Sequence, residues 1–304
     1  MGEINEVHLK TVVNGGWCQA RSFEVTQQQI AQYAVATNDP IASHRVGFVA
    51  PPVFAVVPSL ATLFDLITEA VPDHLFRHTV HTRQQFEFYR QILPGMRLST
   101  RGKVLSYCPA QRGTEVRIRL ESHDEHGARV VDQVVTLHIR RFKAMRPVGD
   151  CLYDGLAAYG GQTLIQTVFA DIDDDQPFRY AEASGDKTPI HLDISAARSA
   201  GLPDIILHGL CTLAFSTWAV LVTLADSHHH PFVKRLSAEL VSPVHPGCQL
   251  ATTVWRTGVV TDSPRFTFHS AVDGAQVLRG VADIGNALDL TCEKGAAAHA
   301  VDGY

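Results

Sequence analysis

The sequence predicts an α+β fold that is built twice along the chain. Two observations support this prediction: a motif that recurs about 150 residues later, and, in each half, an apolar helical stretch followed by strands of alternating apolar residues. A helix followed by antiparallel strands buries most apolar surface when the sheet wraps around the helix. With 304 residues, 45% of them hydrophobic and 19% charged, the chain is long enough for two such domains.

The repeated motif contains an aspartate and a histidine at a fixed spacing. Residues 33–39 (YAVATND) match residues 180–186 (YAEASGD), and a histidine, His44 or His191, follows each aspartate five residues later. A second shared segment is a Pro-Gly turn that precedes an alternating pattern, in residues 93–98 and 245–250. A repeat of this length is a whole domain and not a solenoid unit.

Each half is expected to contain a short helix and then a longer apolar one. The short helices are predicted to start at capping residues, Thr26 in the first half and one of residues 173–175 in the second. The uncharged stretches 46–64 and 205–225 approach the length of a membrane span, but prolines in the first and a His-Gly step in the second are unfavourable in a bilayer. Each stretch is therefore predicted to be a helix buried on most sides.

Patterns of period two predict the strands, and turn residues predict the boundaries between domains. The expected strands cover residues 85–91, 97–106, 115–121, 130–140, 234–241, 249–258, 265–272 and 276–284. A short helix is expected over residues 194–200. The proposed division is a first domain over 1–145, a linker over 146–163, a second domain over 164–288 and a frayed tail over 289–304.

Composition excludes several classes of function. The 26 Lys and Arg residues against 31 Asp and Glu give a net charge of −5, so no basic surface is available for nucleic acid or an anionic membrane. The six cysteines are widely spaced without a CxxC pair, which predicts reduced, mostly buried thiols. The first residues lack an apolar signal-peptide region, which predicts an intracellular, cytoplasmic protein.

The chemistry is expected in the second half, around Asp186 and His191. Pro189 between them favours an extended turn, so that the carboxylate and the imidazole can face one water molecule and share its activation. Gly209 is predicted to open the following apolar helix. Its main-chain N–H has no partner within the helix and no side chain beside it, which suits a developing oxyanion.

These residues carry a family resemblance. Residues 184–193 (SGDKTPIHLD) together with 206–209 (ILHG) resemble the hydratase motif of the MaoC-like (R)-specific enoyl-CoA hydratases and 3-hydroxyacyl dehydratases. The resemblance extends over most of residues 165–285. It implies a double hot-dog fold, in which each hot-dog domain is a long central helix wrapped by an antiparallel sheet.

The same resemblance implies the reaction and the roles of the site residues. Asp186 and His191 would be the catalytic pair, and the Gly209 amide would polarise the thioester carbonyl. The implied reaction is reversible syn addition of water to a trans-2-enoyl thioester of CoA or acyl-carrier protein, which gives the (R)-3-hydroxyacyl product. It implies no cofactor and no metal. The residues expected to contact substrate are Ser184, Gly185, Lys187, Thr188, His208 and Arg235, and a homodimer is possible.

Two departures from the family pattern stand out. Thr188 occupies a position where the family usually has Asn, a longer side chain that helps to hold the site. In the first half, Asp39 and His44 keep their spacing, but Pro52 takes the place of the glycine and has no N–H to donate. The first half is therefore predicted to be a degenerate copy that cannot catalyse. The family resemblance implies that it shapes the tunnel for the acyl chain, with Phe54, Val57 and Leu60 as candidate lining residues, whereas helix spacing alone favours core packing for them.

Other readings remain open on the sequence alone. A hot-dog thioesterase would use the same fold to hydrolyse the thioester, and a non-catalytic acyl-thioester binding subunit would result if Thr188 disabled the site. The cluster 228–230 (HHH) is predicted to be a solvated loop, not a metal site. The acidic run 171–175 is expected to cap a helix because it lacks the glycine and terminal glutamate of a calcium loop. Arg90 is a further candidate for contact with substrate phosphates.

Overall fold

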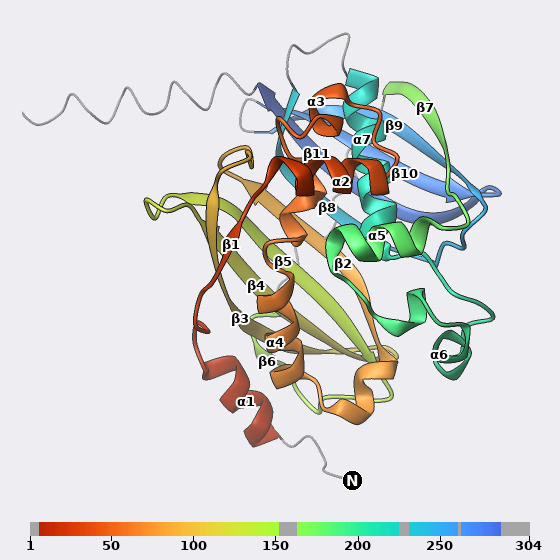
Figure 1. Ribbon diagram of the computed structural model, residues 1–304. Coiled ribbons are helices and arrows are strands. Elements are labelled where there is room, and N and C mark those ends of the chain that lie inside the picture. The colour runs from red at the N-terminus through yellow and green to blue at the C-terminus, as the bar shows by residue number, and fades with distance from the viewer. Residues whose placement is uncertain (1–5, 152–162, 225–230, 261–262, 287–304) are drawn as a thin grey trace, which may run out of the picture.

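The computed structural model describes residues 6–151, 163–224, 231–260 and 263–286, and its strands form one 11-stranded antiparallel sheet (Figure 1). The strand order is β1-β3-β4-β5-β2-β8-β11-β10-β9-β7, with β6 paired to β3. The two halves meet where β2 pairs with β8 at the centre. Strands of the first half are β1 Arg21–Glu24, β2 Thr79–Phe88, β3 Arg97–Ala110, β4 Gly113–His123, β5 Arg129–Arg140 and β6 Val148–Gly149. Those of the second are β7 Thr163–Asp171, β8 Pro231–Leu240, β9 Gln249–Val260, β10 Ser263–Val272 and β11 Ala275–Asn286.

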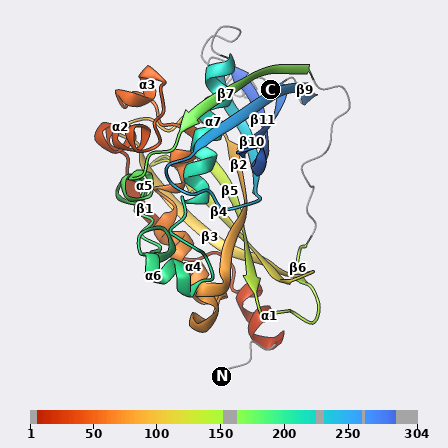
Figure 2. The same cartoon turned by 90° about the vertical axis from the view of Figure 1, so that its right-hand side faces the viewer.

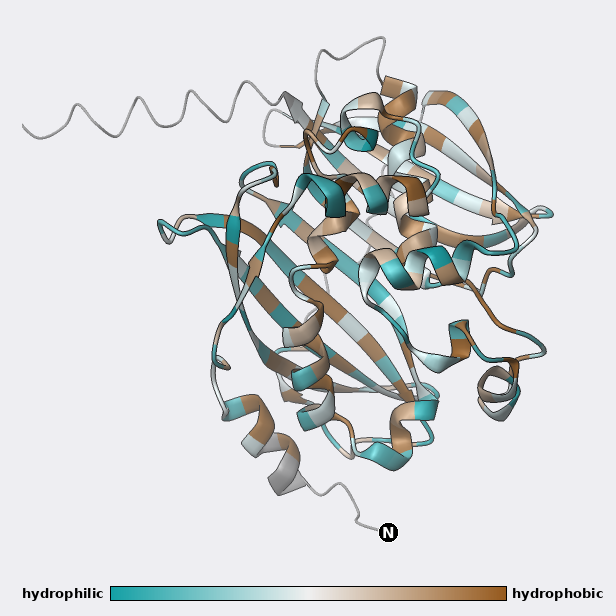
Figure 3. Ribbon diagram, in the orientation of Figure 1, coloured by the Kyte–Doolittle hydropathy of each residue, from teal (hydrophilic) through white to brown (hydrophobic). Residues whose placement is uncertain are grey.

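The eight predicted strands are confirmed, and most are two to four residues longer than their patterns. Figure 3 shows why the patterns were readable: brown and teal bands alternate along the strands, because one face packs on helices and the other faces outward. The sequence missed β1 and β7, which form the two edges of the sheet. The tail, the 228–230 cluster and most of the proposed linker lie outside the described residues.

The second apolar helix is confirmed. Helix α7, Gly209–Leu224, buries all of its residues except Gly209, Val222 and Thr223. Figure 1 places it behind the short helix α5, Gln176–Ser184, and against the strands of the second half. None of the described helices is long and apolar enough to cross a membrane.

The expected helix over residues 46–64 is wrong. This stretch contains the end of α3 (Ala42–Arg45 and its cap), the 3₁₀ turn η1 (Pro52–Val56), and only the start of α4 (Leu60–Ala70). Proline lacks an N–H and its ring clashes with the preceding turn, so Pro51, Pro52 and Pro58 keep a regular helix from forming before Leu60. Helix α4 then crosses the first half of the sheet, where it packs on β3 and β4 (Figure 1).

The repeat is visible in space because the two short helices pack against each other. Helix α2, Gln27–Ala36, begins at Thr26 with a capping box, as predicted, and contacts α5. Tyr33 of α2 and Tyr180 of α5, which correspond in the repeat, lie edge to face with ring centroids 5.7 Å apart. The Trp218 indole of α7 also donates to the carbonyl oxygen of Thr37 across the halves, at 3.0 Å. Figure 2 shows α2, α5 and the short helix α6, Ile194–Ser199, together on one side of the sheet.

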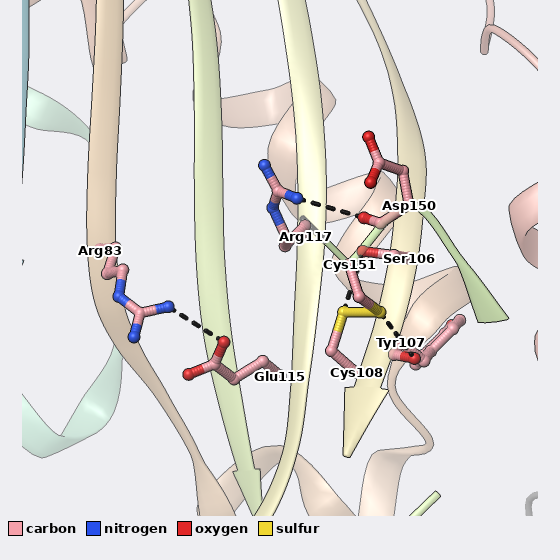
Figure 4. Close-up of a disulfide and its surroundings, with 8 residues drawn as sticks. All are labelled: Arg83, Ser106, Tyr107, Cys108, Glu115, Arg117, Asp150 and Cys151. Carbon is pink, nitrogen blue, oxygen red and sulfur yellow. Dashed lines mark hydrogen bonds and ion pairs between the residues drawn. A yellow bond between two sulfur atoms is a disulfide. The ribbon is translucent and has the colours of Figure 1, made fainter. Parts of the chain in front are cut away.

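The prediction of reduced cysteines is wrong for one pair. Cys108 and Cys151 form a disulfide, with Cα atoms 5.6 Å apart (Figure 4). Their proximity depends on pairing between β3 and β6, which no spacing in the sequence reveals. Among the described residues Cys18, Cys211 and Cys248 are free thiols, and only Cys211 is fully buried.

Candidate active site

The loop between α5 and α6 carries Asp186 and His191 and is fixed at both ends. Helix α5 ends at Gly185, whose φ of 82° lies in the left-handed region that favours glycine. At the other end the Asp193 side chain caps α6 by accepting from the Ala196 amide. Between these points Pro189 starts a single 3₁₀ turn, Pro189–His191. The predicted short helix over 194–200 is confirmed within one residue.

The Asp186 carboxylate is held on one of its two oxygens. Oδ1 accepts from the Thr188 main-chain N–H at 3.1 Å and from the Thr188 hydroxyl at 2.6 Å, which is an Asx-type turn. The Ser184 hydroxyl accepts from the Asp186 amide at 3.1 Å and adds a second restraint on the loop. Thr188, in place of the usual Asn, therefore orients the carboxylate directly and leaves Oδ2 available.

His191 is buried and has a defined tautomer. Its Nδ1 lies 2.8 Å from the main-chain oxygen of Ile206, which can only accept, so Nδ1 carries the hydrogen and Nε2 presents a lone pair. Burial lowers the pKa of His191 below the ordinary 6.5, while the Ile206 hydrogen bond and the Asp186 charge oppose this in part. The ring is therefore a neutral base near pH 7.

His208 contacts both Asp186 and His191. Its Nε2–H donates to the main-chain oxygen of Asp186 at 3.0 Å, and its ring stacks on that of His191 with centroids 3.8 Å apart. Burial, followed by the nearby His191, lowers the pKa of His208 to about 3, so it stays neutral. His208 therefore holds the loop that carries Asp186 and His191.

The three groups also have the proximity of a metal site, but not its directions. Ligand atoms of Asp186, His191 and His208 all lie within 4.8 Å of one another. The two imidazole planes are stacked with only 25° between them, so their in-plane lone pairs run side by side and do not converge on one ion. This geometry suits acid–base chemistry better than metal ligation.

Gly209 begins α7, as predicted, directly beside the two histidines. The first amides of a helix have no carbonyl partner within it and lie at the positive end of the helix dipole. A Cβ atom added to Gly209 would lie 2.4 Å from Cδ1 of Leu240, which is too close for any other residue to fit without a shift. Packing therefore favours glycine here, because a larger residue would displace the Leu240 side chain.

The corresponding pair of the first half is arranged differently. His44 Nδ1 lies 2.7 Å from Asp39 Oδ2, and both side chains are buried. Oδ1 of Asp39 accepts from the Ile41 amide at 2.8 Å. The two groups satisfy each other, whereas in the second half no hydrogen bond between Asp186 and His191 occurs in the described structure. Pro52 opens the following turn without an N–H.

The side chains of the predicted basic residues pair with carboxylates other than Asp186. Lys187 is exposed and pairs with Glu182 at 2.9 Å, and Arg90 pairs with Asp124. Arg235 is on the outer face of β8, where it pairs with Glu87 of β2 at 2.9 Å. The structure therefore does not bring Arg235 to the loop of Asp186 and His191, because alternation along β8 directs Leu236 and Ala238 inward instead.

Two residues of the first half reach the site. Leu60, at the start of α4, lies against Gly185, since a Cβ there would be 3.4 Å from the leucine Cδ2. Phe54, by contrast, is buried against Tyr33 with ring centroids 5.5 Å apart. His81 of β2 lies close enough to Asp186 for that charge to raise its pKa. Sequence reasoning missed His81. Aligning the two halves on their Pro-Gly turns would have placed His81 opposite Val233 and shown a histidine where the other copy has valine.

Comparison with known families matches both halves of the chain. Residues 158–271 match the MaoC like domain, and residues 13–133 match the FAS1-like, dehydratase domain region. Peroxisomal multifunctional enzyme type 2 of Drosophila melanogaster is 29% identical over 92% of this chain, which spans about half (48%) of that protein. The peroxisomal enoyl-CoA hydratase 2 of Arabidopsis thaliana is 25% identical over 78% of this chain and 84% of its own length.

Solved structures agree on the fold. A MaoC-like dehydratase from Phytophthora capsici superimposes with a TM-score of 0.78 and 20% identity, over 91% of this chain and 98% of that one. A Mycobacterium tuberculosis protein described as a double hotdog fold gives a TM-score of 0.58 at 14% identity, over 88% and 96% of the two chains. With a helix packed on the strands of each half, this chain has a double hot-dog fold, in which the first half matches the FAS1-like dehydratase region and the second the MaoC like domain.

Proposed function

We propose that this protein is an (R)-specific 2-enoyl-CoA hydratase, or 3-hydroxyacyl-thioester dehydratase in the reverse direction. The observation that supports this most is the open pair of Asp186 and His191 beside the Gly209 amide. Side-chain atoms of Asp186, His191 and His208 lie within 4.8 Å of one another, and Gly209, the residue after His208, begins α7. Relatives named as enoyl-CoA hydratases agree with this reaction class.

In the proposed mechanism, Asp186 and His191 together activate one water molecule. The water oxygen bonds to C3 of the enoyl group while its proton passes to the Asp186–His191 pair. The same pair then delivers a proton to C2, so that atoms and charge balance over the cycle. Because both groups lie on the same side of the bound substrate in this arrangement, addition would be syn.

The Gly209 amide would stabilise the charge that develops on the thioester oxygen. Attack at C3 moves electrons toward C2 and the carbonyl, giving an enolate-like transition state. An N–H fixed at the first turn of α7 needs no reorganisation to donate to that oxygen. The acyl chain would extend past Leu60, so that the first half contributes to its pocket.

The first prediction concerns the reaction itself. Purified protein incubated with trans-2-enoyl-CoA is expected to abolish the conjugated enoyl absorbance without releasing free thiol, and chiral analysis should give the (R)-3-hydroxyacyl product. Thiol release would instead identify a thioesterase. Unchanged enoyl absorbance without thiol release would indicate a non-catalytic binding subunit. Arg235→Ala serves as a surface control, since Arg235 only pairs with Glu87 on the outer face.

The second prediction concerns pH. The reaction needs neutral His191, and burial lowers the pKa of this histidine below 6.5. The midpoint of His191 protonation therefore lies below pH 6.5, so kcat/KM, which reports the free enzyme, is expected to fall at low pH with a midpoint below 6.5. A pH profile of kcat/KM tests this, and an acidic limb centred above pH 6.5 would contradict the assignment.

A further inference from the structure

Strand β2 presents its side chains in strict alternation over most of its length. Arg83 and Glu87 point outward, where they pair with Glu239 and Arg235 of the neighbouring strand β8. Gln84 and Phe86 are buried on the inner face. Strict alternation toward the start of the strand would place His81 outward beside Arg83.

A β-bulge reverses this alternation at His81. In the pairing of β2 with β5, His81 lies opposite Leu137 and Arg83 lies opposite Thr136, so Thr82 is an extra residue. An extra residue in a strand interrupts the alternation, so the residues before the bulge face the opposite side from the one that strict alternation predicts. His81 is therefore turned to the inner face, the face on which the helices and the catalytic loop lie.

The second half of the chain carries the same bulge with a different residue. In the pairing of β8 with β11, Arg235 lies opposite Asp283 and Val233 opposite Ile284, so Lys234 is the extra residue. Val233 and His81 each stand thirteen residues before the proline of their Pro-Gly turn. The repeat therefore places valine in one copy where the other has histidine.

The position of Val233 shows what this bulge residue faces. Val233 is buried and lines one hollow together with His44, the histidine of the Asp39–His44 pair. Val233, the bulge residue of the second half, therefore lies beside the Asp–His pair of the first half. By this pseudo-symmetry His81 faces Asp186 and His191, and the influence of the Asp186 charge on His81 agrees.

The imidazole of His81 has a fixed orientation. Its Nε2 lies 2.8 Å from the main-chain oxygen of Arg83 and must donate to it. Burial lowers the pKa of His81 by more than the Arg83 hydrogen bond, the Asp186 charge and a hydrogen bond with Gln84 raise it, so the ring is neutral near pH 7. Nδ1 is then a hydrogen-bond acceptor.

We propose that His81 is a positioning residue of the proposed hydratase. Its Nδ1 accepts a hydrogen bond from a water molecule whose other hydrogen is donated to Asp186, and this fixes Oδ2 of the carboxylate toward the substrate. Thr188 holds only the other oxygen, Oδ1. The first half of the chain therefore contributes a polar group to the active site of the second, in addition to covering the acyl chain.

His81→Val tests this by installing the residue of the second copy. With trans-2-enoyl-CoA, kcat is expected to fall about tenfold with KM within twofold of wild type, as for loss of one positioning hydrogen bond. His81→Asn keeps an acceptor near the place of Nδ1 and is expected to recover most of kcat. His138→Val is the matched control, since His138 on β5 also contacts a main-chain oxygen, that of Arg112 at 3.3 Å, but outside the site.

Combining variants separates this role from a structural one. If His81 acts through Asp186, His81→Val made in Asp186→Asn should cause no further loss of kcat. The proposal is overturned if His81→Val retains wild-type kcat, if His81→Asn is as impaired as His81→Val, or if the two losses multiply. It rests on the proposed function: a wild-type protein without hydratase activity refutes both, whereas an active wild type with an equally active His81→Val refutes only the role of His81.

Discussion

Asp186→Asn is expected to lower kcat for hydration of trans-2-enoyl-CoA by about 10³-fold, within the range that general acid–base groups contribute. The amide can still accept from Thr188, as the carboxylate does at 2.6 Å, so the loop should keep its shape. What is lost is the ability to take and return a proton. His191→Ala should have a similar effect because it removes the Nε2 lone pair. Steady-state kinetics of each variant measures the loss of kcat, and thermal unfolding shows whether the fold is kept.

The first-half pair provides the matched control for these variants. Asp39→Asn changes the same residue type at the equivalent repeat position, and its Oδ1 and Nδ2 can still serve Ile41 and His44. We expect activity within twofold of wild type and a lower Tm, because the partner of a buried histidine changes. A loss of kcat comparable to that of Asp186→Asn would show that the first copy is not degenerate.

The sequence was most informative where chemistry and structure are local. Asp186, Pro189 and His191 lie within one loop, and the bonds that hold them come from residues at most 22 positions away, as from His208 to the Asp186 carbonyl. Strand patterns were likewise readable because burial alternates residue by residue. Local spacing therefore sufficed to place Asp186 and His191 in one loop and to predict eight of the strands.

Features that depend on distant pairing were not predictable in this way. The disulfide of Cys108 needs β6 to pair with β3, and the placement of His81 needs a bulge that only the β2–β5 register reveals. Arg235 matched a family-like segment, yet its side chain follows the outer face of β8. The apolar stretch 46–64 was misread because hydropathy outweighed its three prolines, each of which removes a helix hydrogen bond.

Gly209→Pro is expected to lower kcat by about 10²-fold, the effect of removing one oxyanion donor. Proline is tolerated at the first position of a helix, so the main consequence for the reaction is loss of the N–H that would face the thioester oxygen. The first half already has this arrangement at Pro52. Any side chain at position 209 also meets Leu240, because an added Cβ lies 2.4 Å from its Cδ1.

The effect of the missing amide must therefore be separated from this clash. In a Leu240→Ala background the three atoms that a Cβ at position 209 would contact are gone. Gly209→Ala should then recover kcat to near that of Leu240→Ala alone, whereas Gly209→Pro should remain about 10²-fold lower. Since both double variants carry a Cβ and only one keeps the N–H, equal activity of the two would show that the Gly209 amide does not stabilise the transition state.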